Sequence, residues 1–394
     1  MVDLGMSPLC ESFLAADQLD AMEPFYPLRV EVCGSCLLAQ LPAYVPPEDI
    51  FTEYAYFSSF SDSWVEHARR HAERTRDRFG LGPSSLVVEL ASNDGYLLQH
   101  FLPHGIPVLG IEPARNVAAA AVARGVPTIT EFFGVELADR LAGEGRRADL
   151  IVANNVLAQV PDLNDFVAGM ALLLSPRGVA TVEFPHLLRL VDGNQLDTIY
   201  HEHFSYFSLL TAVRVFAAHD LTVFDVDELP THGGSLRLFV RHAGDRAEPR
   251  AAAVGELLAR ERAAGMTDPA WYTAFGERAE AAKHDLVEFL IGQRRAGRQV
   301  AGYGAPGKGN TLLNFCGIRT DLLAYTVDRN PYKQGKFLPG TRIPIFGPDR
   351  VAETRPDVIL ILPWNLRDEI AAQLAGTRAW GASLAVPIPR LEVF

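Results

Sequence analysis

The chain has 394 residues, of which 48% are hydrophobic and 21% charged, and its formal net charge is −12 at pH 7. This length provides for two or three domains with substantial cores. The negative charge, without runs of Lys and Arg interleaved with aromatic residues, argues against a nucleic-acid partner. No run approaches the ~18 apolar residues of a membrane span, and the acidic start lacks the pattern of a secretory signal, so we expect a cytoplasmic protein.

The first fifty residues contain three of the four cysteines, Cys10, Cys33 and Cys36. Cys33 and Cys36 lie in RVEVCGSCLLAQL, which predicts two short strands around a turn, the geometry of half a zinc site. Tetrahedral structural zinc needs four ligands, and the sequence offers no second such pair. Zinc at Cys33 and Cys36 and a metal-free pair therefore both remain open, and we expect Cys10, in an apolar run, to be a buried thiol.

From Leu86 onward, short apolar runs alternate with helical segments, the pattern of a parallel sheet covered on both faces. The expected strands are 86–91, 107–112, 126–130, 149–154 and 178–184, with helices that include 114–124 and 164–174. Two longer strands, 221–229 and 234–242, follow as a β-hairpin. Five parallel strands followed by a hairpin is the order expected of a class I methyltransferase sheet, so the fold class is α/β.

The carboxyl ends of these strands carry the residues expected to bind a cofactor, because doubly wound folds bind ligands there. The turn after the first strand has one glycine, Gly95, where a dinucleotide loop needs three, and no basic residue for a pyrophosphate. S-adenosylmethionine needs neither. Glu112 follows Glu89 by 23 residues, the position from which a carboxylate accepts ribose hydroxyl protons. The predicted cofactor contacts are Glu89, Ala91, Asn93, Gly95, Glu112, Phe132, Phe133 and Asn154.

The segment TIYHEHFSYFS, residues 198–208, is the densest cluster of reactive side chains. If it is helical, Tyr200 and His203 lie one turn apart on one face, with His201 and Glu202 pointing elsewhere. Histidine is suited to moving protons at neutral pH, and a neighbouring phenol can stabilise the anion formed. The cluster therefore predicts proton abstraction, although an isolated His is more often structural.

The C-terminal stretch VAGYGAPGKGNTLLN places Gly302, Gly304 and Gly307 in the dinucleotide pattern, between a strand and a helix. A second strand ends at Asp328, which completes a βαβ unit and makes an NAD-dependent oxidoreductase a real alternative. A Rossmann-like domain can also hold another ligand, and the first sheet already has a cofactor-like arrangement. We therefore assign this loop, with Lys308, to the substrate.

Several ordered segments resemble the deoxysugar C-methyltransferase family: ELASNDGYLLQ, GIEP, NNVLAQVPDLNDF, DTIYHEHFSYFS, LPTHGGSLR, GYGAPGKGNTLLN and VDRNPYKQGKFLPG. The resemblance covers nearly the whole chain. It implies a small zinc-binding module at 1–55, a class I methyltransferase domain at 56–245, a helical connector at 246–297 and a Rossmann-like C-terminal domain at 298–394. The implied reaction transfers a methyl group from S-adenosylmethionine to a ring carbon beside the keto group of a nucleotide-linked sugar, commonly a dTDP-4-keto-deoxysugar.

The resemblance also implies site residues. His203 corresponds to the proposed base, with Tyr200 and Glu202 in the same site, and the fourth predicted catalytic residue is Gln159. The predicted substrate contacts are Tyr56, Phe57, Asn155, Gly233, Ser235, Gly304, Lys308 and Asn310. A non-catalytic nucleotide-sugar binder and the NAD-dependent oxidoreductase stay as alternatives, and monomer and dimer are both open.

Two departures from the family pattern bear on these expectations. The family's zinc domain begins with a CxxC pair upstream of a DLGxxPL segment, whereas this chain begins MVDLGMSPL, so we expect a truncated module. Gln159 stands where the family generally has a His. Glutamine can donate a hydrogen bond to an enolate or keto oxygen but cannot shuttle a proton, which shifts the acid-base work to His203.

Overall fold

The structure is a computed structural model that describes residues 1–52, 57–245 and 249–394. It forms two compact units, each built from separate stretches of the chain. The central unit comprises Val45–His186 and Phe204–Gly265, and the composite unit comprises Met1–Tyr44, Leu187–His203 and Met266–Phe394. Residues 187–203 thus belong to the composite unit, although the boundaries expected from the sequence include them in the domain 56–245.

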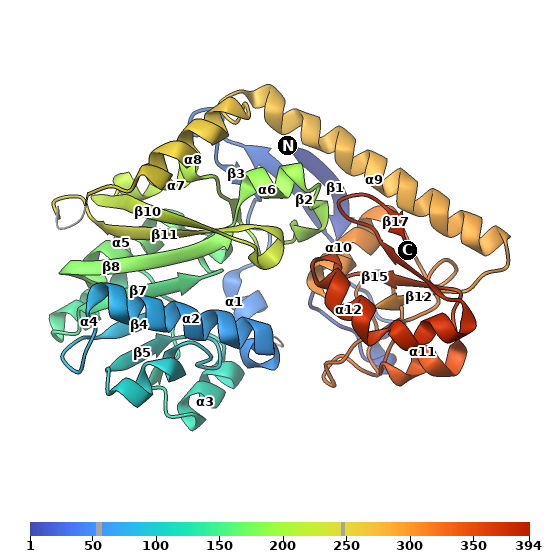
Figure 1. The fold of residues 1–394 in the computed structure, drawn as a ribbon, viewed down its shortest axis with the longest axis horizontal. Coiled ribbons are helices and arrows are strands. Elements are labelled where there is room, and N and C mark those ends of the chain that lie inside the picture. The colour runs from blue at the N-terminus through green and yellow to red at the C-terminus, as the bar shows by residue number, and fades with distance from the viewer. Residues whose placement is uncertain (53–56, 246–248) are drawn as a thin grey trace. The chain divides into compact units, whose positions relative to one another are not determined.

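The central unit contains a seven-stranded sheet with the order β10-β11-β8-β7-β4-β5-β6 (Figure 1). The parallel strands are β4 (Val87–Leu90), β5 (Val108–Ile111), β6 (Thr128–Ile129), β7 (Ala148–Asn154) and β8 (Leu174–Pro185). The antiparallel pair is β10 (Leu221–Leu229) and β11 (Ser235–His242). Every residue of β4 and β5 is buried, as expected for strands covered on both faces. The predicted class I methyltransferase order of strands is confirmed.

Helices cover both faces of this sheet. They are α1 (Pro47–Phe51), α2 (Asp62–Phe79), α3 (Arg115–Ala123), α4 (Val135–Gly143), α5 (Leu163–Leu173), α7 (Leu209–Ala217) and α8 (Ala252–Ala263). Helix α2 begins at Ser61, whose Oγ accepts from the Trp64 N–H at 3.3 Å, and ends at Gly80, whose φ is 61°. Its buried Trp64 and Ala68 join the core formed with β4 and β5.

The composite unit contains two sets of strands. At the N-terminus β1 (Val2–Ser7), β2 (Tyr26–Val32) and β3 (Ala39–Gln40) pair antiparallel. The C-terminal sheet has the order β14-β13-β12-β15-β16-β17. Its strands are β12 (Val300–Tyr303), β13 (Thr326–Val327), β14 (Ile345–Phe346), β15 (Val358–Ile361), β16 (Ser383–Val386) and the antiparallel β17 (Glu392–Val393). The sequence predicts a second Rossmann-like domain in this region, at 298–394.

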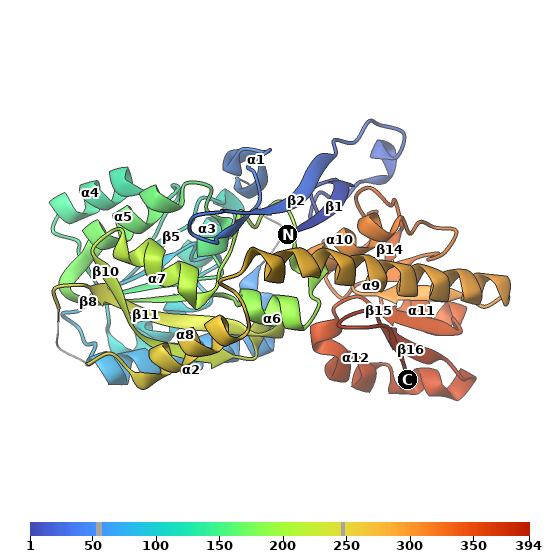
Figure 2. The same ribbon diagram turned by 90° about the horizontal axis from the view of Figure 1, so that it is seen from above.

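The helices of the composite unit are α6 (Leu187–Asp192), α9 (Pro269–Arg295), α10 (Gly307–Cys316), α11 (Asp349–Thr354) and α12 (Arg367–Gln373). Figures 1 and 2 show α9 on the opposite side of the C-terminal sheet from α12. Among the described residues, no helix is both long and apolar enough to cross a membrane.

A buried carboxylate fixes the start of α7 within the central unit. Glu261 on α8 is fully buried and accepts hydrogen bonds from the N–H groups of Leu209 and Leu210 at 2.7 and 2.8 Å. It also lies 2.7 Å from Nε2 of His186, which follows β8 directly. One carboxylate therefore satisfies the free amides of a helix start and ties two helices to the end of a strand.

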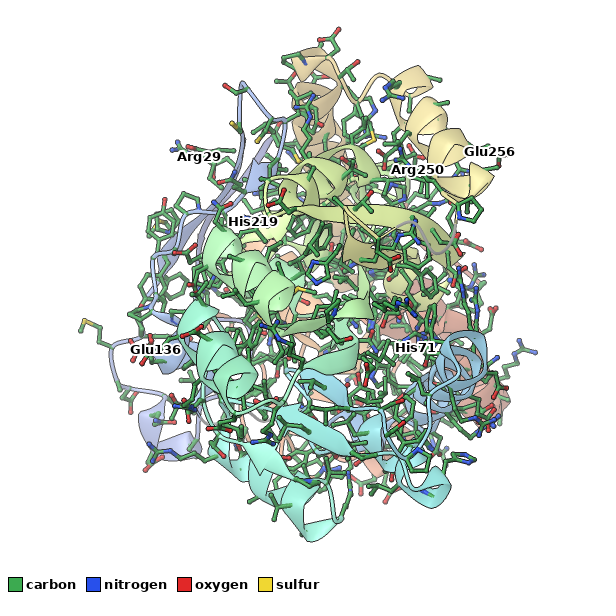
Figure 3. The ribbon with its side chains drawn as sticks, turned by 90° about the vertical axis from the view of Figure 1, so that its left-hand side faces the viewer. Arg29, His71, Glu136, His219, Arg250 and Glu256 are labelled. Atoms are coloured by element: carbon green, nitrogen blue, oxygen red, sulfur yellow. The ribbon has the colours of Figure 1, made fainter. Side chains whose placement is uncertain are left out.

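Replacing Glu261 with Ala removes the acceptor for these donors and leaves them buried. We expect a loss of about 3 kcal/mol in the free energy of unfolding, measured by urea denaturation. The matched control is Glu256→Ala, an exposed position on the same helix (Figure 3), which we expect to change stability by less than about 0.5 kcal/mol. Equal effects of the two substitutions would contradict the structural role of Glu261.

Candidate active site

The loop after β4 uses a left-handed backbone at three alternate residues. The φ angles of Ala91, Asn93 and Gly95 are 54°, 49° and 78°. Only Gly95 adopts this conformation without strain, and a Cβ there would lie 3.0 Å from Val126. Left-handed Ala and Asn residues are uncommon and tend to occur at functional sites. A count of glycines therefore understates how tightly this loop turns.

Two buried carboxylates, Glu89 and Glu112, lie at the ends of adjacent strands. Glu112 accepts from the N–H groups of Asn93 at 2.9 Å and Ala114 at 2.8 Å. Burial raises the pKa of Glu112, although these two N–H groups act in the opposite direction. Burial also raises the pKa of Glu89 well above its usual value, with Tyr96 opposing this shift. This edge of the sheet therefore holds carboxylates that a cationic ligand with hydroxyl donors would stabilise.

Asn154 ends β7 beside β4, and its side chain is buried. Neither its Oδ1 nor its Nδ2 has a hydrogen-bond partner among the described residues. Buried polar atoms are normally paired, so this amide marks a position where a ligand supplies the partner. S-adenosylmethionine fits these residues because it carries a sulfonium, an ammonium, a carboxylate and two ribose hydroxyls. Of the two predicted adenine contacts, Phe133 packs edge-on against Phe166 at 5.3 Å, whereas Phe132 is 42% exposed.

An ionic cluster around the buried Glu183 and Arg237 lies at the carboxyl end of β8. Glu183 contacts Nε2 of His67 at 3.0 Å, accepts from Thr231 Oγ1 at 3.0 Å and forms an ion pair with Arg237. Burial alone would raise the pKa of Glu183, but the hydrogen bond from His67 and the charge of Arg237 outweigh it and lower the pKa to about 2. The carboxylate is therefore ionised at physiological pH. Nothing in the local sequence signalled this Glu183 cluster.

The predicted substrate residues of the central unit lie in the loops beside this cluster. Asn155 follows β7, and its Nδ2 is 3.3 Å from Nε2 of His232. Gly233 has a φ of 88°, and Ser235 Oγ donates to the Thr231 carbonyl at 3.0 Å. The sequence reading named Gly233 and Ser235 but missed His232.

Three other predicted residues are less closely tied to these loops. Gln159 ends a short 3₁₀ turn, Leu157–Gln159, and is half-buried. Phe57 stacks on Phe60 with 5.3 Å between ring centroids. Tyr56 lies outside the described residues.

In the composite unit, residues 199–203 form a turn, so the helix considered for Tyr200 and His203 is wrong. The His203 N–H donates to the Tyr200 carbonyl at 2.9 Å, and the two rings lie 4.2 Å apart between centroids. A tight turn thus brings the Tyr200 and His203 rings together, as the expected helix would have done. Nδ1 of the buried His203 is 3.1 Å from the Thr198 carbonyl oxygen. Because a carbonyl oxygen only accepts, Nδ1 carries the proton and Nε2 is the basic nitrogen.

The other two residues of this segment contact the N-terminal segment of the composite unit. Glu202 is buried and its Oε1 accepts from Cys10 Sγ at 3.7 Å. Cys10 is a buried thiol, as predicted, and burial raises its pKa well above the usual value. His201 contacts the Pro27 carbonyl oxygen through Nε2 at 3.2 Å, and burial lowers its pKa. His201 is therefore held against the N-terminal strands.

The glycine-rich loop after β12 is closed by its own contacts. Both oxygens of Asp328 accept backbone hydrogen bonds, from Ala305 at 2.7 Å and Asn330 at 2.8 Å. A Cβ on Gly304 would lie 2.5 Å from Pro363, and one on Gly307 would lie 2.8 Å from Cys10 Sγ. In this structure the Asp328 carboxylate therefore binds backbone N–H groups. A ribose hydroxyl would have to displace these hydrogen bonds to reach it. These contacts argue against the NAD alternative.

Lys308 and Asn310 lie in the first turns of α10. Lys308 donates to Asn365 Oδ1 at 2.9 Å and lies 4.8 Å above the Trp364 ring. The same Trp364 donates through Nε1 to the buried Asp197 at 2.7 Å. Burial lowers the pKa of Lys308 and raises that of Asp197 to about 6, and the Lys308 charge opposes the latter shift.

Asn310 Nδ2 donates to the Cys10 carbonyl, while its buried Oδ1 has no partner in the part of the chain that the structure describes. Cationic Lys308, this amide and the N-terminus of α10 form a polar site suited to a phosphate group.

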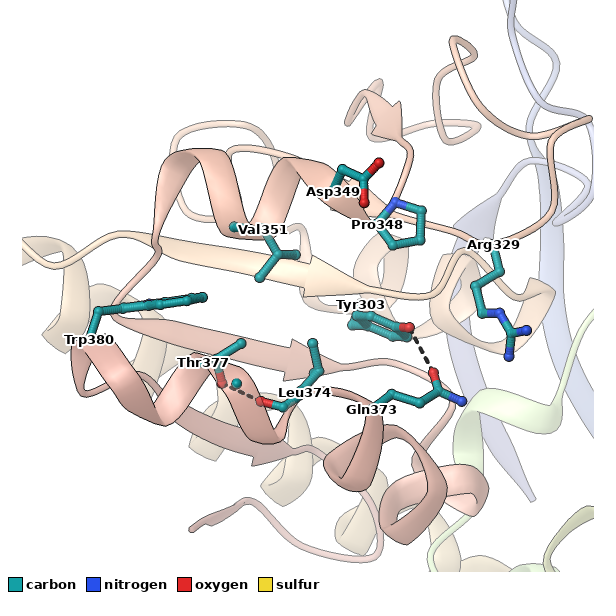
Figure 4. Close-up of a pocket in the computed structure, with 11 residues that line it drawn as sticks. Tyr303, Arg329, Pro348, Asp349, Val351, Gln373, Leu374, Thr377 and Trp380 are labelled. Carbon is teal, nitrogen blue, oxygen red and sulfur yellow. Dashed lines mark hydrogen bonds between the residues drawn. The ribbon is translucent and has the colours of Figure 1, made fainter.

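A hollow of about 660 Å³ lies elsewhere in the composite unit, between the C-terminal sheet and helices α11 and α12 (Figure 4). Its lining includes Tyr303, Val351, Leu374 and Trp380, with Arg329 and Asp349 at one end. None of the site residues predicted from the sequence is among its lining residues.

Comparisons with known proteins identify the family. Residues 64–226 match the model "Methyltransferase domain", residues 230–389 match "C-methyltransferase C-terminal domain" and residues 1–51 match "Putative zinc binding domain". The chain is 38% identical to "C-methyltransferase NovU" of Streptomyces niveus over 393 residues, which is all of this chain and 93% of that protein. The chain belongs to the C-methyltransferase family. It is an enzyme that uses S-adenosylmethionine.

Other similarities are partial. A ubiquinone biosynthesis O-methyltransferase of Bartonella tribocorum is 26% identical over 113 residues, 28% of this C-methyltransferase and 46% of that protein. The structure of 1,6-didemethyltoxoflavin-N1-methyltransferase of Burkholderia thailandensis aligns at 19% identity and a TM-score of 0.38, covering 54% of this chain and 97% of that one.

The residues present do not fit a closed zinc site. Cys33 and Cys36 lie on the predicted turn between β2 and β3, where the Leu37 N–H donates to the Cys33 carbonyl at 2.9 Å. Hydrogen bonds from the backbone of Cys36 and Ser35 lower the pKa of the Cys33 thiol. Within residues 1–52, 57–245 and 249–394, no group of three or more His, Cys, Asp or Glu side chains is placed to hold a metal ion. Two thiolates leave half of a tetrahedral shell unfilled.

Replacing Glu112 with Gln tests the cofactor site. The amide nitrogen of Gln would face one of the backbone N–H groups that the carboxylate accepts, and the negative charge is lost. We expect at least about tenfold weaker binding of S-adenosylhomocysteine, measured by calorimetry. Glu136→Gln, at an exposed position on α4 (Figure 3), is the control. Unchanged affinity of the Glu112 variant would exclude it from the cofactor site.

Asp197 gives a pH-dependent prediction. Its pKa is raised from 3.8 to about 6 in the folded protein, so its contribution to stability is complete below pH 3.8 and is lost as the pH rises through 6. The free energy of unfolding of the wild type, minus that of Asp197→Asn, should fall by about 1.4 kcal/mol between pH 5 and pH 8. Urea denaturation at both pH values measures this. A constant difference for Asp197→Asn would refute the prediction.

Proposed function

We propose that this C-methyltransferase methylates the carbon beside the keto group of a nucleotide-linked deoxysugar, with dTDP as the expected nucleotide, and that His203 is the base. The observation that carries the proposal is the hydrogen bond between Nδ1 of His203 and the Thr198 carbonyl, beside the Tyr200 ring. A fixed tautomer with a basic Nε2 is what a group needs to remove a proton from carbon at neutral pH.

Each part of the reaction has a residue suited to it. A ketone acidifies the neighbouring C–H, and His203 removes that proton. Hydrogen-bond donors then stabilise the enolate oxygen, a role for which we propose Tyr200 and the amide of Gln159. S-adenosylmethionine, when bound, supplies an electrophilic methyl group, and Glu89, Glu112 and Asn154 are the residues proposed to hold it.

The proposed diphosphate contacts are in the composite unit. Lys308 provides a cation and Asn310 a buried amide at the start of α10. Both follow Gly304, whose left-handed φ of 88° starts the loop. Lys308 lies above the Trp364 ring, whose Nε1 donates to Asp197. The Asp197 charge opposes the lowering of the Lys308 pKa by burial. A dianionic group would raise the pKa of Lys308 again on binding.

Calorimetry separates this function from its alternative. We expect S-adenosylhomocysteine to bind and NAD to leave no heat signal, because Asp328 and the glycine loop satisfy each other. NAD binding without S-adenosylhomocysteine binding would overturn the proposal. Tight binding of a dTDP-sugar without any methyl transfer would instead identify a non-catalytic binder.

Replacing His203 with Ala should lower kcat by ~10²-fold or more, the contribution of a general base, while the affinity for S-adenosylhomocysteine stays the same. Methyl transfer from labelled S-adenosylmethionine to a dTDP-4-keto-deoxysugar measures the rate. The control is His201→Ala, two residues away, where the imidazole contacts the Pro27 carbonyl. A His203 variant that keeps more than about a tenth of the wild-type rate would rule out this base.

A further inference from the structure

Strained backbone is concentrated at one edge of the central sheet. Of the non-glycine residues with positive φ, four lie in loops at the carboxyl ends of its parallel strands: Ala91, Asn93, Asn155 and His232. The last two have φ angles of 55° and 53°, and their side chains meet. Two non-glycine residues with left-handed backbone that contact each other across separate loops are a feature that tends to occur at functional sites.

The contact between these side chains has a defined direction. An amide nitrogen only donates, so Nε2 of His232, 3.3 Å from Asn155 Nδ2, accepts. His232 is therefore neutral there, with its proton on Nδ1. The two ends of a carboxamide have nearly the same shape, and an acceptor on one side decides which end is nitrogen. His232 thus determines that the other end of Asn155 is Oδ1.

The imidazole is itself held in place. Its ring packs edge-on against Trp64 of α2, with 5.0 Å between ring centroids. Thr231, one residue before it, donates to the ionised Glu183 at 3.0 Å. The Gly234 N–H in turn donates to the Thr231 carbonyl at 2.9 Å. The Asn155 N–H also donates to the Glu183 carbonyl, at 2.7 Å. Both partners are therefore anchored to the same residue of β8.

The remaining atom of this arrangement is Oδ1 of Asn155. It is buried, and in the described part of the chain it has no hydrogen-bond partner. A buried acceptor that is held in a fixed orientation and left unsatisfied is poised for a donor from a ligand. The donors available in this reaction are an O–H of the sugar and the N–H of the cofactor ammonium.

We propose that His232 is a positioning residue that orients Asn155 so that its Oδ1 accepts a hydrogen bond from a hydroxyl group of the sugar substrate. This rests on the proposed function, in which Asn155 lies on the substrate side. His232 then contributes to choosing sugars that carry a hydroxyl donor at this point, without touching the sugar itself.

Two substitutions separate this role from a purely backbone role. Gln places an amide oxygen near the position of Nε2, so His232→Gln keeps an acceptor for Asn155 but disfavours positive φ. Asn tolerates positive φ but is too short, so His232→Asn keeps the backbone and loses the acceptor. We expect kcat/KM to fall about tenfold in His232→Asn and less than about threefold in His232→Gln, with the Kd of S-adenosylhomocysteine unchanged in both.

A double-mutant cycle provides the decisive readout. Once Asn155→Ala has removed the amide, adding His232→Asn should cost no further activity, because His232 acts through Asn155. The control is His219→Asn (Figure 3), which removes an exposed imidazole 3.0 Å from Asn164 Oδ1 and should leave kcat/KM unchanged.

Three results would overturn the proposal. Full activity of His232→Asn with impaired His232→Gln would show that only the backbone matters. Additive losses in the cycle would show that His232 acts independently of Asn155. Weaker S-adenosylhomocysteine binding with an unchanged sugar KM would assign Oδ1 to the cofactor ammonium. If the wild type neither binds nor methylates a dTDP-4-keto-deoxysugar, the proposed function fails first, and this inference falls with it.

Discussion

The ion pair between Glu183 and Arg237 supports the carboxyl edge of the central sheet. Burying two charges is costly unless they are paired, and here His67 and Thr231 supply further contacts to Glu183. These four residues come from β8, β11, α2 and the turn before β11. The pair therefore fixes the position of that turn relative to the sheet. Glu183 therefore holds this turn through its carboxylate and Asn155 through its backbone carbonyl.

The two units differ in the charge of the side chains at their proposed ligand sites. The central unit gathers buried carboxylates, Glu89 and Glu112, whose pKa values are raised by burial. The composite unit instead holds a partly buried cation, Lys308, above an aromatic ring and within the influence of the Asp197 charge. A positively charged cofactor and a negatively charged diphosphate are the ligands that each arrangement favours. The preference of the central unit for a cationic cofactor agrees with the chain being an S-adenosylmethionine-dependent C-methyltransferase.

The sequence predicted the fold well because parallel strands buried on both faces leave unmistakable apolar runs, as in β4 and β5. It also named Glu89 and Glu112, which the structure places at the ends of adjacent strands, and Tyr200 and His203, whose rings lie together. It failed where the interaction joins residues far apart: Asp197 and Trp364 are separated by 167 positions, and Arg237 and Glu183 by 54. It also failed where the residue type does not reveal the backbone conformation. Ala91 and Asn93 adopt positive φ angles, which are most common for glycine. The turn at Tyr200 shows that the same spacing brings two rings together without a helix.

The composite unit has a consequence for how the protein is made. Its three segments include the first strand of the chain, the short stretch that carries His203 and everything after Met266. During synthesis the first two segments leave the ribosome long before β12 and α10 exist, so this unit cannot complete its core until the C-terminal sheet has been synthesised. The central unit, in contrast, has all its residues by Gly265. A nascent chain can therefore complete the sheet proposed to bind the cofactor before the unit that contains the proposed base, His203, has its C-terminal sheet.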